Sequence, residues 1–141
     1  MNTELKKPAQ QFIKGEGLVL VVDDEPIMRK IAINVLKNCG YDVIAAENGF
    51  KALEIFEKQH PQIKLVLLDL VMPQKSGKET YLEMKQIQAD VNVLLVSGAK
   101  RDIRIKELLK MGVRGYLEKP YTFFHLSRLV HQLIYKKDKK V

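Results

Sequence analysis

The sequence predicts a doubly wound α/β domain, with a parallel sheet covered by helices on both faces. Five short apolar segments alternate with five segments whose apolar residues recur at helical spacing. The apolar segments are nearly continuous, as is typical of strands buried on both faces. The chain of 141 residues is long enough for one domain with a sizeable core.

The strands are expected where a short apolar run is bounded by charged or turn-forming residues. These runs lie at 18–23, 41–46, 64–69, 92–97 and 114–118.

The first helix is expected to begin near Pro26 and to end at Gly40. Ile27, Ile31 and Val35 recur four residues apart between them. Proline suits the first turn of a helix, and glycine suits the residue just beyond its end.

The next two helices carry capping signals. Asn48 can cap a second helix, whose apolar residues are Ala52, Leu53 and Phe56. Ser76 and Glu79 form the S-x-x-E pattern of a capping box before a third helix, whose apolar residues are Tyr81, Leu82 and Met84.

Two further helices complete the alternation. The fourth is expected near 101–111, stops at Gly112, and carries Ile105, Leu108 and Leu109. The last is expected over 123–135, with one apolar stripe made of Leu126, Leu129, Val130, Leu133 and Ile134.

The two ends of the chain lack this pattern. Residues 1–16 are expected to form a flexible leader, 17–135 the domain, and 136–141 a basic tail. Of the net charge of +7, the tail contributes +3 and the leader +1. The tail is therefore expected to be a solvated end or a linker stub, with a polyanion contact as the alternative.

The composition favours a cytoplasmic protein. No apolar run is long enough to cross a membrane, and the N-terminus lacks the apolar segment of a signal peptide. The single cysteine, Cys39, excludes an internal disulfide and suits a reducing compartment. We expect Cys39 to be a small apolar residue near a helix end.

Polar residues follow four of the five expected strands. Asp23 and Asp24 follow the first strand, Asp69 ends the third, Ser97 ends the fourth, and Lys119 follows the fifth. Ligands of open parallel sheets bind outside the carboxyl ends of the strands, so these residues meet at one rim if their strands are neighbours.

This set of residues suits a divalent cation and a phosphoryl group. Three close carboxylates repel one another unless a cation intervenes, and Mg²⁺ prefers such oxygen ligands. Asp69 could then attack phosphorus, while Lys119 and Ser97 contact phosphoryl oxygens. Each signal alone is more often a turn or a cap, so the prediction depends on their coincidence.

The same residues resemble the receiver domains of bacterial two-component response regulators. The matching motifs are Asp23-Asp24-Glu25, Asp69-x-x-Met72-Pro73-x-x-x-Gly77, Val96-Ser97-Gly98-Ala99 and Lys119-Pro120. The resemblance covers about residues 17–135 and implies a flavodoxin-like fold with strand order 2-1-3-4-5.

The resemblance also implies the chemistry of the site. Asp69 would accept a phosphoryl group from a sensor histidine kinase or a histidine phosphotransfer protein. Asp24, Asp69 and the backbone carbonyl of Val71 would ligate Mg²⁺ directly, with Asp23 acting through water and Mn²⁺ as a substitute cation. Lys119 would contact the phosphoryl group, and its bond to Pro120 would be cis.

A conformational switch is implied as well. Ser97, which replaces the commoner threonine, would move toward the phosphate, and Tyr116 would turn inward. The surface of the fourth helix, fifth strand and fifth helix would then change its downstream protein partner or form a phosphorylation-linked homodimer. We expect no direct nucleic-acid binding and no membrane association.

An aspartate-nucleophile phosphatase that depends on Mg²⁺ is the alternative function. Such enzymes need a second acid two residues after the nucleophile, and here that residue is Val71. We therefore expect a phosphoacceptor that assists its own phosphorylation and slow dephosphorylation, rather than an enzyme. The three histidines, His60, His125 and His131, are expected at surface or boundary positions.

A basic run is expected on the fourth helix, made of Lys100, Arg101, Arg104, Lys106 and Lys110. Such a run is usually a solvated face, and partner docking is the alternative.

Overall fold

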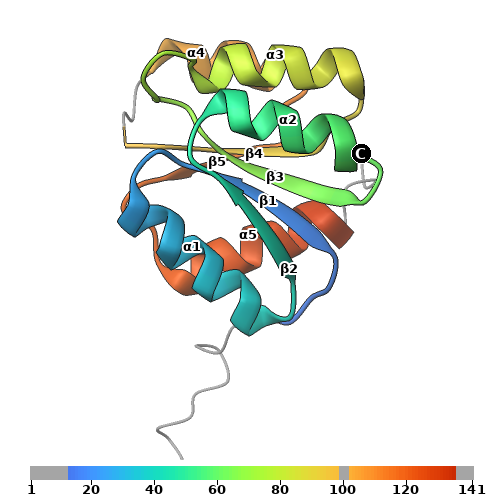
Figure 1. Cartoon of the computed structure of the whole chain (residues 1–141). Helices are drawn as coiled ribbons and strands as arrows, with labels where there is room; N and C mark the ends of the chain where they lie inside the picture. Colours follow the sequence, from blue (N-terminus) through green and yellow to red (C-terminus); the bar gives the residue numbers. More distant parts are fainter. Residues whose placement is uncertain (1–12, 99–101, 136–141) are drawn as a thin grey trace, which may run out of the picture.

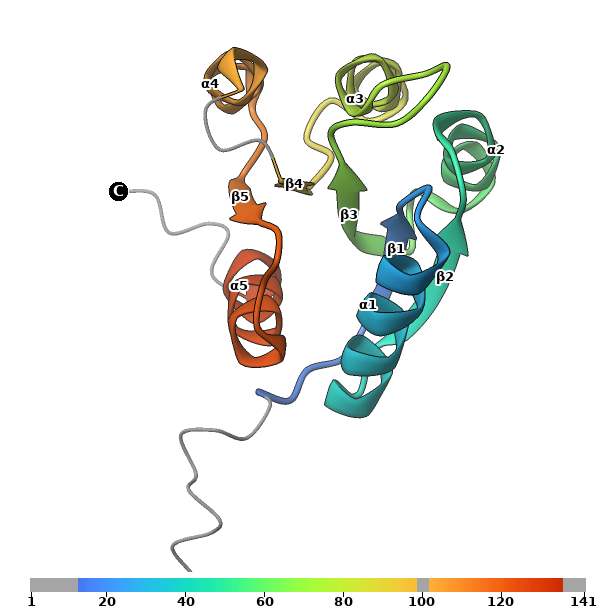
Figure 2. The same ribbon diagram turned by 90° about the vertical axis from the view of Figure 1, so that its left-hand side faces the viewer.

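In the computed structural model, which describes residues 13–98 and 102–135, a five-stranded parallel sheet lies between two layers of helices (Figure 1). The strands are β1 (Leu18–Val22), β2 (Asp42–Ala46), β3 (Ile63–Asp69), β4 (Val93–Ser97) and β5 (Gly115–Glu118). Their order is β2-β1-β3-β4-β5, which Figure 2 shows along the sheet. The predicted fold class and strand order are confirmed.

The helices divide between the two faces of the sheet. One layer contains α1 (Pro26–Cys39) and α5 (Phe123–Tyr135), and the other contains α2 (Gly49–Gln59), α3 (Gly77–Ile87) and α4 (Ile103–Met111) (Figure 1). Side chains of β3 alternate between the layers: Val66 and Leu68 pack in the core under α2, α3 and α4, whereas Leu65 and Leu67 pack in the other core. This double burial explains the continuous apolar run of β3.

The predicted helix ends are confirmed by their local geometry. The Asn48 side chain accepts a hydrogen bond from the Lys51 N–H at 2.8 Å. Ser76 and Glu79 form both bonds of the capping box. Gly40 ends α1 with φ of 110°, a left-handed conformation that glycine adopts without steric cost.

Some apolar residues are more exposed than their spacing predicted. Ile27 of α1 is 72% exposed, and Leu109 of α4 is 42% exposed. Helical spacing places a residue on a face, but burial also requires that the neighbouring layer reach that turn. The helix expected from residue 101 begins at Ile103, where Asp102 accepts a hydrogen bond from the Arg104 N–H at 3.0 Å.

Residues 13–17, which we call the strap, are hydrogen-bonded to the domain although most of them were expected in a flexible leader. The Gly15 N–H donates to the Cys39 carbonyl at 2.9 Å, and the Glu16 N–H donates to the Tyr135 hydroxyl at 2.9 Å. The strap thus connects the end of α1 to the end of α5.

Parts of the leader and tail predictions concern residues outside the described ranges, namely 1–12 and 136–141. Within the described ranges, no helix has the length and apolar character needed to cross a membrane.

Candidate functional site

The carboxylate of Asp69 is delivered by the last residue of β3 and is 4% exposed. The Leu70 N–H continues the pairing with β4 by donating to the Val96 carbonyl, and the Gly77 N–H closes the following turn by donating to the Leu70 carbonyl, each at 2.9 Å. A Cβ on Gly77 would lie only 2.4 Å from the Asp69 carbonyl oxygen. This close approach explains the glycine in the Met72-Pro73-x-x-x-Gly77 motif.

Two more carboxylates follow β1. Asp23, Asp24 and Asp69 each offer one carboxylate oxygen, and these three oxygens lie within 4.8 Å of one another. Asp23 is held from both sides: its Oδ1 accepts the Glu25 N–H at 2.9 Å, and its carbonyl accepts a hydrogen bond from Arg29 Nη1 at 2.7 Å. Strands far apart in the sequence therefore bring the predicted acids together.

The donor set of this cluster fits a hard divalent cation. All three side chains offer carboxylate oxygens, which Mg²⁺ prefers over nitrogen or sulfur. Asp24 is the most exposed of the three and leaves the cluster open toward solvent. Val71 donates a backbone hydrogen bond to Asp69, and its side chain is 54% exposed.

Lys119 reaches the cluster from the end of β5. Its N–H donates to the Ser97 carbonyl at 2.9 Å, and its peptide bond to Pro120 is cis. Its Nζ lies 3.2 Å from Asp23 Oδ2, 3.4 Å from Asp69 Oδ2 and 3.0 Å from Glu25 Oε1.

The electrostatics of the site follow from burial and proximity. Burial, and then the charge of Asp23, raise the pKa of Asp69 to about 7, although Lys119 offsets part of their effect. Burial alone would lower the pKa of Lys119. The hydrogen bond with Glu25 and the charges of Asp69 and Asp23 outweigh burial, so the Lys119 pKa lies above its ordinary value.

The two residues expected to switch lie side by side. Ser97 ends β4 and is 1% exposed. Tyr116 on β5 is partly buried, and its hydroxyl donates to the Ser97 carbonyl at 3.4 Å.

A family model described as the response regulator receiver domain matches residues 19–131. This chain belongs to the response regulator receiver family. Receiver domains are signalling domains of two-component systems that interact with histidine kinases and bind Mg²⁺.

Curated relatives of this receiver differ in architecture. It is 32% identical over 103 residues to the chemotaxis protein CheY of Halobacterium salinarum, covering 73% of this chain and 84% of that protein. It is 31% identical over 126 residues to the sensor kinase CckA of Brucella abortus, covering 89% of this chain but only 13% of the kinase. It also spans about half, 49%, of a probable transcriptional regulator, ycf27, of Porphyridium aerugineum at 34% identity over 86% of this chain.

Solved structures agree with this membership. A response regulator receiver domain protein from Clostridium thermocellum aligns with a TM-score of 0.81 at 29% identity, covering 86% of this chain and 97% of that chain. The response regulator TrrA of Thermotoga maritima, solved in complex with Mg²⁺ and BeF, aligns with a TM-score of 0.74 at 32% identity, covering 83% and 98%.

Three residues of this receiver site were not predicted to contact it. Glu25 pairs with Lys119, and Arg29 holds the backbone of Asp23. Tyr121 lies beside the cluster, where burial and then the charge of Asp23 raise its pKa to about 12. Glu25 is part of the Asp23-Asp24-Glu25 motif and Tyr121 directly follows Lys119-Pro120, so the sequence carried a signal for both, whereas it carried none for Arg29.

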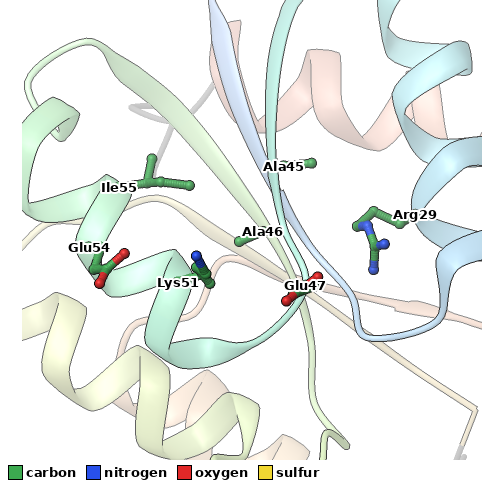
Figure 3. Close-up of a pocket in the computed structure, with 7 residues that line it drawn as sticks. All are labelled: Arg29, Ala45, Ala46, Glu47, Lys51, Glu54 and Ile55. Atoms are coloured by element: carbon green, nitrogen blue, oxygen red, sulfur yellow. The ribbon is translucent and has the colours of Figure 1, made fainter.

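A hollow of about 420 Å³ adjoins the receiver site on the side of Arg29 (Figure 3). It opens between α1 and α2 beside the end of β2, and its lining carries both charges: Arg29, Ala45, Ala46, Glu47, Lys51, Glu54 and Ile55. The strand β2 contributes Ala45 and Ala46 to this lining.

The basic run of the fourth helix is divided by the structure. Lys100 and Arg101 lie outside the described residues, as does Ala99 of the Val96-Ser97-Gly98-Ala99 motif. Arg104 Nη2 pairs with Asp102 Oδ2 at 2.6 Å, within the first turn of α4. The hydrogen bond from the Arg104 side chain lowers the pKa of Asp102, which indicates that Arg104 stabilises the ionised N-cap of α4.

The histidines lie at boundaries, as expected. His60 caps the end of α2, with Nδ1 at 3.1 Å from Gln88 Oε1. His125 and His131 are partly buried on α5.

Proposed function

We propose that this receiver accepts a phosphoryl group on Asp69 from a phosphohistidine of a sensor histidine kinase or histidine phosphotransfer protein. One observation carries the proposal. The buried Asp69 carboxylate lies within 4.8 Å of the acids Asp23 and Asp24 and 3.4 Å from the Lys119 ammonium. A nucleophile, cation ligands and a positive counter-charge therefore surround one point at the edge of the sheet.

The transfer is an in-line displacement at phosphorus. An oxygen of Asp69 forms the new O–P bond while the N–P bond of the phosphohistidine breaks, and the electron pair returns to the imidazole. Lys119 pairs with a phosphoryl oxygen and offsets its charge. Asp24, Asp69 and the Val71 carbonyl would hold Mg²⁺ or Mn²⁺, with Asp23 acting through water. The cation supplies charge neutralisation on the phosphoryl oxygens.

The response would begin at Ser97 and Tyr116. The Ser97 hydroxyl would donate to a phosphoryl oxygen, and Tyr116 would turn inward. The hydrogen bond between Tyr116 and the Ser97 carbonyl supports this coupling. The surface of α4, β5 and α5 would then favour a downstream protein or a second copy of the chain.

Val71 distinguishes this role from that of a phosphatase. An aspartate-nucleophile phosphatase needs an acid two residues after its nucleophile, and a valine side chain cannot transfer a proton. The phosphoryl group is therefore held as a signal and lost slowly. The chain assists both its own phosphorylation and its own dephosphorylation.

Incubation with acetyl phosphate and Mg²⁺, followed by intact mass measurement and tryptic mapping, tests the proposal. We expect one phosphoryl adduct on the peptide of Asp69 and none in Asp69→Asn. Asp42→Asn, the same change at an exposed residue that begins β2, should keep the adduct. An adduct in Asp69→Asn, or one formed equally without Mg²⁺, would contradict the site.

A further inference from the structure

Glu25 occupies the N-cap of α1 but makes no side-chain capping bond. Its side chain instead reaches Lys119, which is 94 residues away in sequence, with Oε1 at 3.0 Å from Nζ. This is the shortest of the three contacts between Lys119 and carboxylates. Glu25 is also the one partner of the three that does not belong to the acidic cluster.

The Lys119 ammonium and a cation compete for the same oxygens. Asp23 and Asp69 belong to the acidic cluster, and both also contact Lys119 Nζ. The ammonium has three N–H donors and faces three carboxylates, and it lies nearer to Glu25 Oε1, at 3.0 Å, than to Asp23 Oδ2 or Asp69 Oδ2, at 3.2 and 3.4 Å. Glu25 therefore draws positive charge away from the cation ligands.

The same bond works against a phosphoryl group on Asp69. When Asp69 carries a phosphoryl group, Lys119 must pair with one of its oxygens. Glu25 competes with that oxygen for the Lys119 ammonium and adds a negative charge near the phosphoryl group. The Glu25 side chain is 58% exposed, so the pair is weak, as suits a contact that breaks and re-forms.

We propose that Glu25 is a positioning residue that acts through Lys119. It favours cation binding before phosphorylation and disfavours the phosphoryl group afterwards. This inference rests on the proposed function of Asp69.

The test is calorimetric titration of the whole chain with Mg²⁺, and then with beryllofluoride at saturating Mg²⁺. In Glu25→Gln we expect Mg²⁺ affinity to fall about threefold and beryllofluoride affinity to rise about threefold, the size expected of a weak exposed pair. Urea unfolding of the same variant should match the parent chain, which excludes a folding defect as the cause.

Two further variants separate the contact from its charge. Glu47→Gln removes the same charge from the exposed residue that follows β2, and it should leave both affinities unchanged. Glu25→Asp keeps the charge but shortens the side chain by one methylene, and it should behave like Glu25→Gln. The inference is overturned if Glu47→Gln reproduces both changes, or if Glu25→Asp or Glu25→Gln behaves like the parent chain.

The outcomes also separate this inference from the proposed function. If the parent chain is phosphorylated on Asp69 but Glu25→Gln shows unchanged affinities, only the role of Glu25 fails. If the parent chain binds neither Mg²⁺ nor beryllofluoride, both ideas fail together.

Discussion

Burial, and then the charge of the neighbouring Asp23, favour a proton on Asp69. Its pKa rises from 3.8 to about 7, chiefly through burial. The folded protein therefore holds this proton more tightly than the unfolded chain does. The stabilisation from this group is complete below 3.8 and is lost as the pH rises through about 7. A cation held by the three carboxylates would replace this proton.

This competition predicts the pH dependence of Mg²⁺ binding. Mg²⁺ needs the ionised carboxylate, so its apparent affinity should fall as the pH drops below about 7, by up to roughly tenfold per pH unit. Calorimetric titration between pH 5 and 8 measures the trend. In Asp69→Asn the slope should become much shallower, and an unchanged slope would assign the proton to another group.

The apolar side chain of Val71 leads us to expect a long lifetime for a phosphoryl group on Asp69. This side chain is 54% exposed beside Asp69 and offers nothing that could orient a hydrolytic water. We expect Val71→Asn to shorten the lifetime at least severalfold and Val71→Ile to leave it unchanged. The decay of the intact-mass adduct measures both, and a lifetime of seconds in the parent chain would contradict the idea.

At the scale of elements, the turn from β3 to α3 sets the position of Asp69. Gly77→Ala places a methyl group 2.4 Å from the Asp69 carbonyl oxygen, although alanine is the better helix former. We expect a loss of roughly 2 kcal/mol in unfolding free energy by urea denaturation. Gly98→Ala is the matched control, because its nearest neighbour would be Lys119 Cβ at 4.0 Å. Equal losses in the two variants would refute the steric argument.

Most of these elements could be predicted because their signals are local. Asn48, and Ser76 with Glu79, cap helices through bonds to residues three positions away, and such bonds are readable in the sequence. Exposure was predicted less well. Ile27 continues a helical stripe yet is 72% exposed, because burial depends on the neighbouring layer.

At the scale of the molecule, the site could be predicted only in part. Strand ends in an open parallel sheet meet at one rim, so Asp23, Asp69 and Lys119 could be placed together from their positions in the sequence. The strand order came from the family resemblance. The Glu25 contact depends on the rotamers of two long side chains from distant elements, and no local pattern encodes them.

The strap allows a matched test with one kind of substitution. The Tyr135 hydroxyl bonds to the Glu16 backbone, whereas the buried Tyr41 hydroxyl has no hydrogen-bond partner among the described residues. Tyr135→Phe should lower the unfolding free energy by about 0.5–1 kcal/mol, and Tyr41→Phe should be neutral or stabilising. Urea denaturation measures the unfolding free energy of both variants. A larger loss in Tyr41→Phe than in Tyr135→Phe would contradict the assigned contacts.

The strap also bears on where this domain can be joined to other proteins. The family match begins at residue 19, yet the backbone bonds to Cys39 and Tyr135 come from Gly15 and Glu16. A fusion or excision made at the family boundary would remove these bonds and uncover Tyr41, which Gly15 overlies. Engineered chimeras that transplant this receiver should therefore carry residues 13–17 with it, since they belong to its folding unit.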